Sequence, residues 1–153
     1  MTSQTRSLDS VVREAVAFHG HLGPFLVLGI RMGLTGLREL KANEGELKQA
    51  IAILKQTPPF SCTIDGIQIT THCTVGNGKL KLKDKSDAIS AIFEDKKGEQ
   101  VIVTLRSKKF EELKKALPKN RQSQINIRLA KDIASTPETD LFTIKKRAKI
   151  NAN

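Results

Sequence analysis

The chain has 153 residues and a mass of 16.9 kDa, which suits one domain with one core, and we expect a single domain over residues 1–153. With 39% hydrophobic and 27% charged residues, the composition is that of a folded protein and excludes a disordered chain. The chain has no Trp or Tyr, so it lacks the aromatic side chains on which the bases of single-stranded nucleic acids usually stack. The net charge of +10 invites a polyanion partner, but the basic residues are spread among acids, which favours solvated surfaces over a basic patch for nucleic acid or for an acidic partner protein.

No segment has the pattern of a membrane or export signal. The longest apolar run, from Phe25 to Ile30, is too short to cross a bilayer, and the first ten residues lack an apolar stretch of signal-peptide length. We therefore expect a cytoplasmic protein with no membrane contact, whose two cysteines are free thiols or metal ligands.

Two helices are predicted at the start of the chain. Apolar residues at helical spacing predict a helix from Leu8 to Phe18, with Ser7 as its N-cap. The segment from His19 to Pro24 contains two glycines and predicts a loop that holds His19 and His21, after which a second helix runs from about Pro24 to Leu40.

The second helix carries a stripe of glycines at Gly29, Gly33 and Gly36. Glycine costs about 1 kcal/mol relative to alanine inside a helix, so the stripe needs a reason. Close packing against a neighbouring helix or sheet is favoured, including a copy of this helix in a dimer, and a ligand lying against the helix is the alternative.

The remaining elements alternate in type. A change to period two predicts an antiparallel strand over Lys79–Lys83, and Asp95–Gly98 predicts a hairpin connection. We expect further strands at Gln49–Lys55, Ala88–Phe93, Gln100–Leu105 and Leu141–Ile150, a short helix or turn at Cys62–Ile69, a turn at Thr74–Gly78, and helices at Phe110–Leu117 and Ser123–Ile133. This order predicts an α+β fold, an antiparallel sheet packed against N-terminal and C-terminal helices.

All three histidines and both cysteines fall between His19 and Cys73. Imidazole and thiolate together suit zinc, nickel, copper(I) or iron, so His19, His21, Cys62 and Cys73 are the candidate metal ligands, with zinc the first choice and nickel or iron the alternatives. The spacing between the cysteines is too wide for a zinc knuckle. The ligands must converge through tertiary structure, as in an open functional site.

Two polar residues follow Cys62 on one helical face. Asp65 and Gln68 lie three residues apart, where they can orient a ligating histidine or hold a substrate. Helix capping and surface hydrogen bonding are the alternative roles.

These motifs carry a resemblance to a known family. Phe18-His19-Gly20-His21, Pro24 and Gly29, then Cys62, Asp65-Gly66-Ile67-Gln68, Cys73-Thr74 and Gly76, resemble the FmdE family, which takes its name from molybdenum or tungsten formylmethanofuran dehydrogenase. The resemblance implies an α+β core, a His and Cys cleft that holds a transition metal, and intertwined dimers. Since no cysteine follows Cys73, the chain is similar to a core-only member without the C-terminal zinc finger of some relatives.

The chain departs from the family pattern at two positions. Gly23 stands where many members have a cysteine, so a ligand or nucleophile carried there would be missing. His72, beside Cys73, is either a partial replacement or a surface histidine.

Three functions remain open on the sequence. The first is a dimeric metal-binding protein, an accessory or metal-handling subunit of a redox enzyme. The second is a small enzyme that uses a metal-bound water or a Cys62 thiolate, with Asp65 assisting proton transfer. The third is a basic module that binds nucleic acid or an acidic protein.

Overall fold

The computed structural model describes residues 6–119 and 123–148. Within these residues the chain forms a five-stranded sheet and six helices. In chain order the elements are α1 (Leu8–His19), α2 (Pro24–Leu40), β1 (Gln49–Leu54), α3 (Cys62–Thr71), β2 (Leu80–Asp84), β3 (Ser90–Glu94), β4 (Gln100–Leu105), α4 (Ser107–Ala116), α5 (Gln124–Ser135), α6 (Glu138–Leu141) and β5 (Phe142–Arg147).

The sheet is mixed, although mostly antiparallel, and confirms the α+β class. Its strand order is β2-β1-β3-β4-β5, and β3 and β4 form the predicted antiparallel hairpin. The antiparallel prediction for Lys79–Lys83 is wrong, because β2 pairs in parallel with β1. The chain between these two strands contains α3, and a helical crossover returns the chain in the same direction. Period two sets which side chains share a face but not the direction of the strand.

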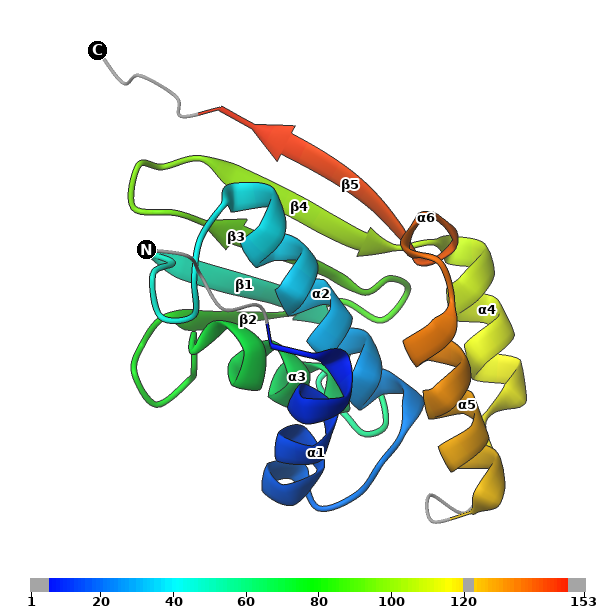
Figure 1. The fold of residues 1–153 in the computed structure, drawn as a ribbon. Helices are drawn as coiled ribbons and strands as arrows, with labels where there is room; N and C mark the ends of the chain where they lie inside the picture. Colours follow the sequence, from blue (N-terminus) through cyan, green and yellow to red (C-terminus); the bar gives the residue numbers. More distant parts are fainter. Residues whose placement is uncertain (1–5, 120–122, 149–153) are drawn as a thin grey trace.

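The helices gather on one face of the sheet. Figure 1 shows α2 crossing in front of the strands, with α1 and α3 beside it and α4 and α5 at the end where β4 finishes. Alternate residues of β1, β3 and β4 are buried toward this layer, including Ala52, Phe93 and Val103. Helix α2 therefore lies at the centre of the helical layer, and its contacts position the helices around it.

The glycine stripe of α2 has the packing role that was favoured from the sequence. A Cβ atom at Gly29 would lie 2.0 Å from the carbonyl oxygen of Thr63 in α3, and one at Gly36 would lie 2.4 Å from the ring of Phe93 in β3. The opposite helix also carries a glycine, since a Cβ at Gly66 would lie 2.4 Å from the carbonyl oxygen of Leu26. The backbones of α2 and α3 thus lie closer together than they could if these positions carried side chains.

Several element boundaries differ from the sequence expectations. Ser7 caps α1 as predicted by accepting from the N–H of Ser10 at 3.2 Å. The helix extends one residue further than expected, to His19, and Gly20 is its C-cap in the left-handed conformation at φ 104°. The segment from Cys62 is a full ten-residue helix rather than a turn. The short helix α6 was not predicted, and the part of the last predicted strand beyond Ala148 lies outside the described residues.

Over the described ranges, no helix combines the length and the apolar character that crossing a membrane requires.

Candidate metal centre

His19 and His21 stand on either side of the turn that ends α1. Gly20 makes this turn because its N–H donates to the carbonyl oxygen of Val16 at 2.7 Å in a left-handed conformation that glycine adopts without strain. The expectation that both histidines lie in a loop is wrong for His19, which is the last residue of the helix. The turn brings the two imidazole rings to a centroid distance of 4.5 Å.

Cys62 reaches the same point from another element. It is the first residue of α3 and is 7% exposed, and the close contact between α2 and α3 holds this end of the helix beside the turn. One ligand atom from each of His19, His21 and Cys62 lies within 4.8 Å of the others. The thiolate is the form of cysteine that binds metals.

A chain of hydrogen bonds orients the His19 ring. Its Nδ1 lies 2.5 Å from Oδ2 of Asp65, and Oδ1 of Asp65 accepts from the side-chain amide of Gln68 at 3.1 Å. The amide oxygen of Gln68 in turn accepts from the N–H of Val75 at 3.0 Å. A carboxylate on Nδ1 fixes a proton there and leaves Nε2 with its lone pair, which is the form of histidine that ligates a metal.

The other nitrogen of His19 supports the fit of this group to a metal. Its Nε2 is buried and has no hydrogen-bond partner among the described residues. A buried polar atom without a partner costs about 1–3 kcal/mol, so native proteins rarely keep one without a reason. Two imidazole nitrogens and one thiolate are a donor set that zinc accepts in sites with an open fourth position. The residues present therefore fit a transition metal.

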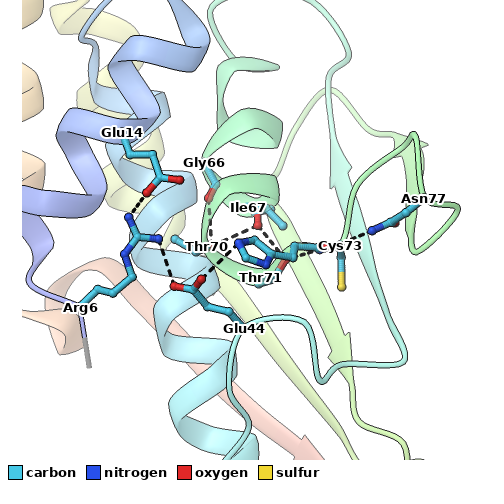
Figure 2. Close-up of polar contacts among 10 residues, drawn as sticks. Arg6, Glu14, Glu44, Gly66, Ile67, Thr70, Thr71, Cys73 and Asn77 are labelled. Atoms are coloured by element: carbon cyan, nitrogen blue, oxygen red, sulfur yellow. Dashed lines mark hydrogen bonds and ion pairs between the residues drawn. The ribbon is translucent and has the colours of Figure 1, made fainter. Parts of the chain in front are cut away.

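Cys73 and His72 lie away from this group, beyond the opposite end of α3. Ten helical residues span about 15 Å. At that end the Cys73 N–H donates to the hydroxyl of Thr71 at 3.1 Å (Figure 2). Burial raises the pKa of the Cys73 thiol. The structure does not bring Cys73 to the other three donors.

The ion pair of His72 shows why it is not a replacement for the cysteine expected at position 23. Its Nε2 lies 3.2 Å from Oε2 of Glu44, and its side chain is 53% exposed. Glu44 also binds Arg6, which pairs with Glu14 of α1 (Figure 2). His72 is thus part of a surface network that ties the end of α3 to the start of α1.

A cavity of about 200 Å³ opens beside the three donors. His21 and Cys62 form part of its wall, and Gly23 and the first turn of α2 form another part. Pro59 adds to this wall, and a further part comes from later in the sequence, including Lys119 and Asn126. A ligand in this cavity would lie directly against two of the candidate metal ligands.

Sequence reasoning missed the distant residues of this wall. Asn126 in the first turn of α5 is only 6% exposed, and its side-chain amide donates to the carbonyl oxygen of Leu22 at 3.3 Å. A Cβ at Gly23 would lie 3.0 Å from the same amide nitrogen, so Asn126 takes the space beside the position where the family pattern has a cysteine. Nothing local in the sequence signals a contact between residues 104 positions apart.

A His and Cys group beside a cavity, carried by a mixed α+β domain, defines a candidate metal-binding protein. The chain belongs to the FmdE family, described as molybdenum formylmethanofuran dehydrogenase operon, which it matches over residues 18–143. This range includes the two histidines, Cys62 and the cavity.

Two individual proteins are similar to the chain. A crystal structure of a tungsten formylmethanofuran dehydrogenase FmdE-like protein from Syntrophus aciditrophicus shares the fold, with a TM-score of 0.61 and 23% identity over 99% of this chain and 78% of that one. A probable S-adenosyl-L-methionine-binding protein from Archaeoglobus fulgidus is 34% identical over 77 residues, which is 48% of this chain. The chain spans 20% of the length of that relative.

Proposed function

We propose that this protein binds a transition metal ion through His19, His21 and Cys62 and serves as an accessory or metal-handling subunit of a redox enzyme. The observation that carries the proposal is the buried, unpartnered Nε2 of His19 in a group of three donors within 4.8 Å, all among the described residues. When bound, the metal would act as a Lewis acid toward a group in the cavity. Asp65 would hold the His19 ring in the ligating orientation, and Gln68 would hold Asp65.

Zinc is the metal we propose first. A site with two imidazoles and one thiolate matches the ligand preference of zinc, while nickel and iron accept the same donors. We leave Cys73 out of the ligand set because it lies beyond the far end of α3 and burial raises the pKa of its thiol. The proposed set is therefore one residue smaller than the set predicted from the sequence.

The link to a redox enzyme is supported by the family, whose description refers to a dehydrogenase operon.

We propose further that the protein acts as a homodimer in the cytoplasm. Light scattering on the full chain tests the dimer, and a single species with the mass of one chain would reject it.

Elemental analysis tests metal binding. Untagged wild-type protein and the double variant His19→Ala/His21→Ala are incubated with zinc and, in separate samples, with nickel or iron, then freed of excess metal and analysed. Cys73→Ser is the matched control. We expect close to one zinc per chain in the wild type and in the control, and a loss in the double variant. A wild type that takes up no zinc, nickel or iron would reject the proposal.

A small thiol- or metal-dependent enzyme is the second candidate, favoured by the placement of Cys62 at a helix N-terminus on a cavity wall. Alkylation of the metal-free protein separates the candidates. Rapid, selective modification of Cys62 at neutral pH would favour the enzyme, and a Cys62 that reacts no faster than Cys73 would count against it.

S-adenosylmethionine is not proposed as a ligand. That name belongs to a relative of which this chain covers 20%. The cavity of about 200 Å³ is also smaller than the roughly 300–1,000 Å³ of pockets that hold larger ligands.

A further inference from the structure

We propose that the open face of the sheet, which points away from α2, binds an amphipathic helix of a partner protein whose apolar stripe is flanked on both sides by Asp and Glu. The inference goes beyond the proposed metal site and does not depend on it, because none of the three candidate metal ligands belongs to a strand. It names a surface of this protein and the chemistry of the partner that fits it.

The middle of the open face is apolar. Helices cover one face of the sheet (Figure 1), and the residues of β1, β3 and β4 that alternate with the buried ones point to the other face. Four of these residues are isoleucines that are partly exposed and lie outside the core: Ile51, Ile53, Ile92 and Ile102. A solvated sheet face normally carries polar residues at such positions, so a continuous apolar strip indicates contact with another molecule.

Positive charges border this strip on both sides. The register aligns one residue of each strand in a row across the sheet, in the order Lys81, Ile51, Ile92, Ile102 and Lys145. Lys83 of β2 and Arg147 of β5 add a second charge at each edge. All four cations are exposed, and none forms an ion pair with a described residue. Strand pairing creates this arrangement, which the spread of the lysines along the chain conceals.

The acidic residues of the strands do not neutralise these cations. Glu94 of β3 is on the open face, but its side chain is 12% exposed, lies 3.4 Å from Nζ of Lys48 and accepts from the side-chain amide of Gln100 at 2.7 Å. Asp84 of β2 pairs with the buried Leu54 and so lies on the helix side. The two edges of the open face therefore complement carboxylates of a partner.

The spacing of the strands matches the width of a helix. Strands about 4.8 Å apart place the isoleucines of β1, β3 and β4 in a strip about 10 Å wide, with the two edge strands about 19 Å from each other. A helix with its side chains is about 10–12 Å wide, so one helix covers the strip. Acidic residues on both flanks of that helix would then lie opposite the cations of β2 and β5.

A second copy of the chain and a nucleic acid fit this face less well. Two copies packed face to face would bring cations against cations at both edges, so we expect the proposed homodimer to use another surface. On the described strands the two aromatic residues, Phe93 and Phe142, are buried on the helix side, so the open face has no aromatic ring on which bases could stack.

Nuclear magnetic resonance of isoleucine methyl groups tests the inference on the full chain. The probe is a synthetic helical peptide of about 18 residues with one stripe of leucines and glutamates on both flanks of the stripe. We expect saturable shifts at Ile51, Ile92 and Ile102, and much smaller shifts at the buried Ile67 and Ile133. Control peptides with glutamine for glutamate, or with serine for leucine, should each bind about tenfold more weakly or worse.

Two charge-reversal variants of equal net charge locate the binding. Lys81→Glu/Lys145→Glu, at the two edges of the open face, should weaken binding of the probe about tenfold or more. Lys108→Glu/Lys131→Glu, at exposed lysines of α4 and α5, should weaken it by less than about threefold, because salt screens charges more than about 10 Å away. Both variants should take up zinc as the wild type does.

Four results would overturn the inference: no saturable shift with the probe, equal weakening by both variants, tighter binding of a DNA oligonucleotide at the same isoleucines, or shifts of these isoleucines with protein concentration alone. The third result would assign the face to nucleic acid, and the fourth to a second copy. Zinc uptake on the same samples keeps the proposals apart. A wild type that binds the probe but no zinc rejects the metal site alone, and one that takes up zinc but ignores the probe rejects the docking face alone.

Discussion

At the scale of single residues, the site depends on how one imidazole is held. His19 is 12% exposed at its side chain, and its two nitrogens have opposite surroundings: Nδ1 faces Asp65, and Nε2 has no partner among the described residues. A ring with one nitrogen committed to a carboxylate cannot turn without breaking a short hydrogen bond. The other nitrogen is thereby aimed before any metal arrives, which lowers the entropy cost of binding.

Removing the charge of Asp65 should therefore weaken metal binding. In Asp65→Asn the side chain keeps its size but loses the carboxylate that fixes the His19 tautomer, and we expect zinc affinity to fall about 10- to 100-fold. Competition with a chromophoric chelator measures the affinity. Asp87→Asn, at an exposed acid, is the control, and equal affinities for the two variants would show that Asp65 does not position the ligand.

At the scale of elements, the contact between α2 and α3 carries the site. Gly29 and Gly66 let the two backbones touch, and this contact fixes the end of α3 at which Cys62 sits. Since the obstacle to a side chain at Gly29 is backbone rather than the end of a flexible side chain, the helices must separate to admit even a methyl group.

Gly29→Ala should thus lower both stability and metal affinity. We expect a loss of about 3 kcal/mol in the free energy of unfolding, because the new Cβ would otherwise lie 2.0 Å from the Thr63 carbonyl oxygen. Gly76→Ala is the matched control, since its Cβ would meet nothing closer than 3.9 Å. Denaturant unfolding measures both, and a Gly29→Ala protein as stable as the control would refute the close contact.

A second contact between elements should depend on pH. Glu138 of α6 accepts from Arg38 at 2.8 and 2.9 Å and from the Thr35 hydroxyl at 2.7 Å, and these bonds, with that of Arg38 the largest influence, lower the pKa of Glu138 below its ordinary value of 4.5. A lowered pKa stabilises the fold above pH 4.5, and this contribution disappears as the pH falls through the lowered value.

Glu138→Gln should therefore destabilise the protein near neutral pH and converge with the wild type in acid. Unfolding measured from pH 7 down to about pH 3 tests this expectation. Glu99→Gln, an exposed acid, should follow the wild type throughout. A stability difference between Glu138→Gln and wild type that stays constant with pH would contradict the assignment.

The elements that were predictable from the sequence are those with a local cause. Ser7 with the apolar period of α1, Pro24 at the start of α2 and the Asp95–Gly98 hairpin act within a few residues. The bounds of α2 and β4 were predicted correctly, while β3 begins two residues later than expected. The parallel direction of β2 was not predictable from alternation, because the crossover through α3 sets it.

The site was predictable in composition but not in geometry. Clustering of histidine and cysteine pointed to the region where the three donors meet, yet local sequence could not distinguish Cys62, at the near end of α3, from Cys73, beyond its far end. The cavity could not be predicted, because Asn126 approaches it only through the packing of α5 on α2, and Lys119 lines it from the segment after α4.

At the scale of the whole molecule, folding and metal binding should be separable. The core is a continuous cluster that includes Leu28, Phe93 and Leu141, all without exposed surface, and it extends well beyond the metal centre. Burial of this size supplies the stability that a small metal-dependent finger lacks.

Removing the metal should leave a folded protein. After dialysis against a chelator, calorimetry should still show one cooperative unfolding transition, and zinc should then raise the midpoint, with about 2.7 kcal/mol of stabilisation when free zinc is about 100 times its dissociation constant. A chain that unfolds on chelation would show that the metal holds the fold together.

The most direct measurement of the central claim is X-ray absorption at the zinc edge, on the wild type and on Cys62→Ser and Cys73→Ser. We expect one sulfur ligand at about 2.3 Å and two imidazole nitrogens at about 2.0–2.1 Å in the wild type and in Cys73→Ser, and no sulfur ligand in Cys62→Ser. A spectrum without sulfur, or a sulfur ligand that disappears in Cys73→Ser instead, would contradict a centre built from His19, His21 and Cys62.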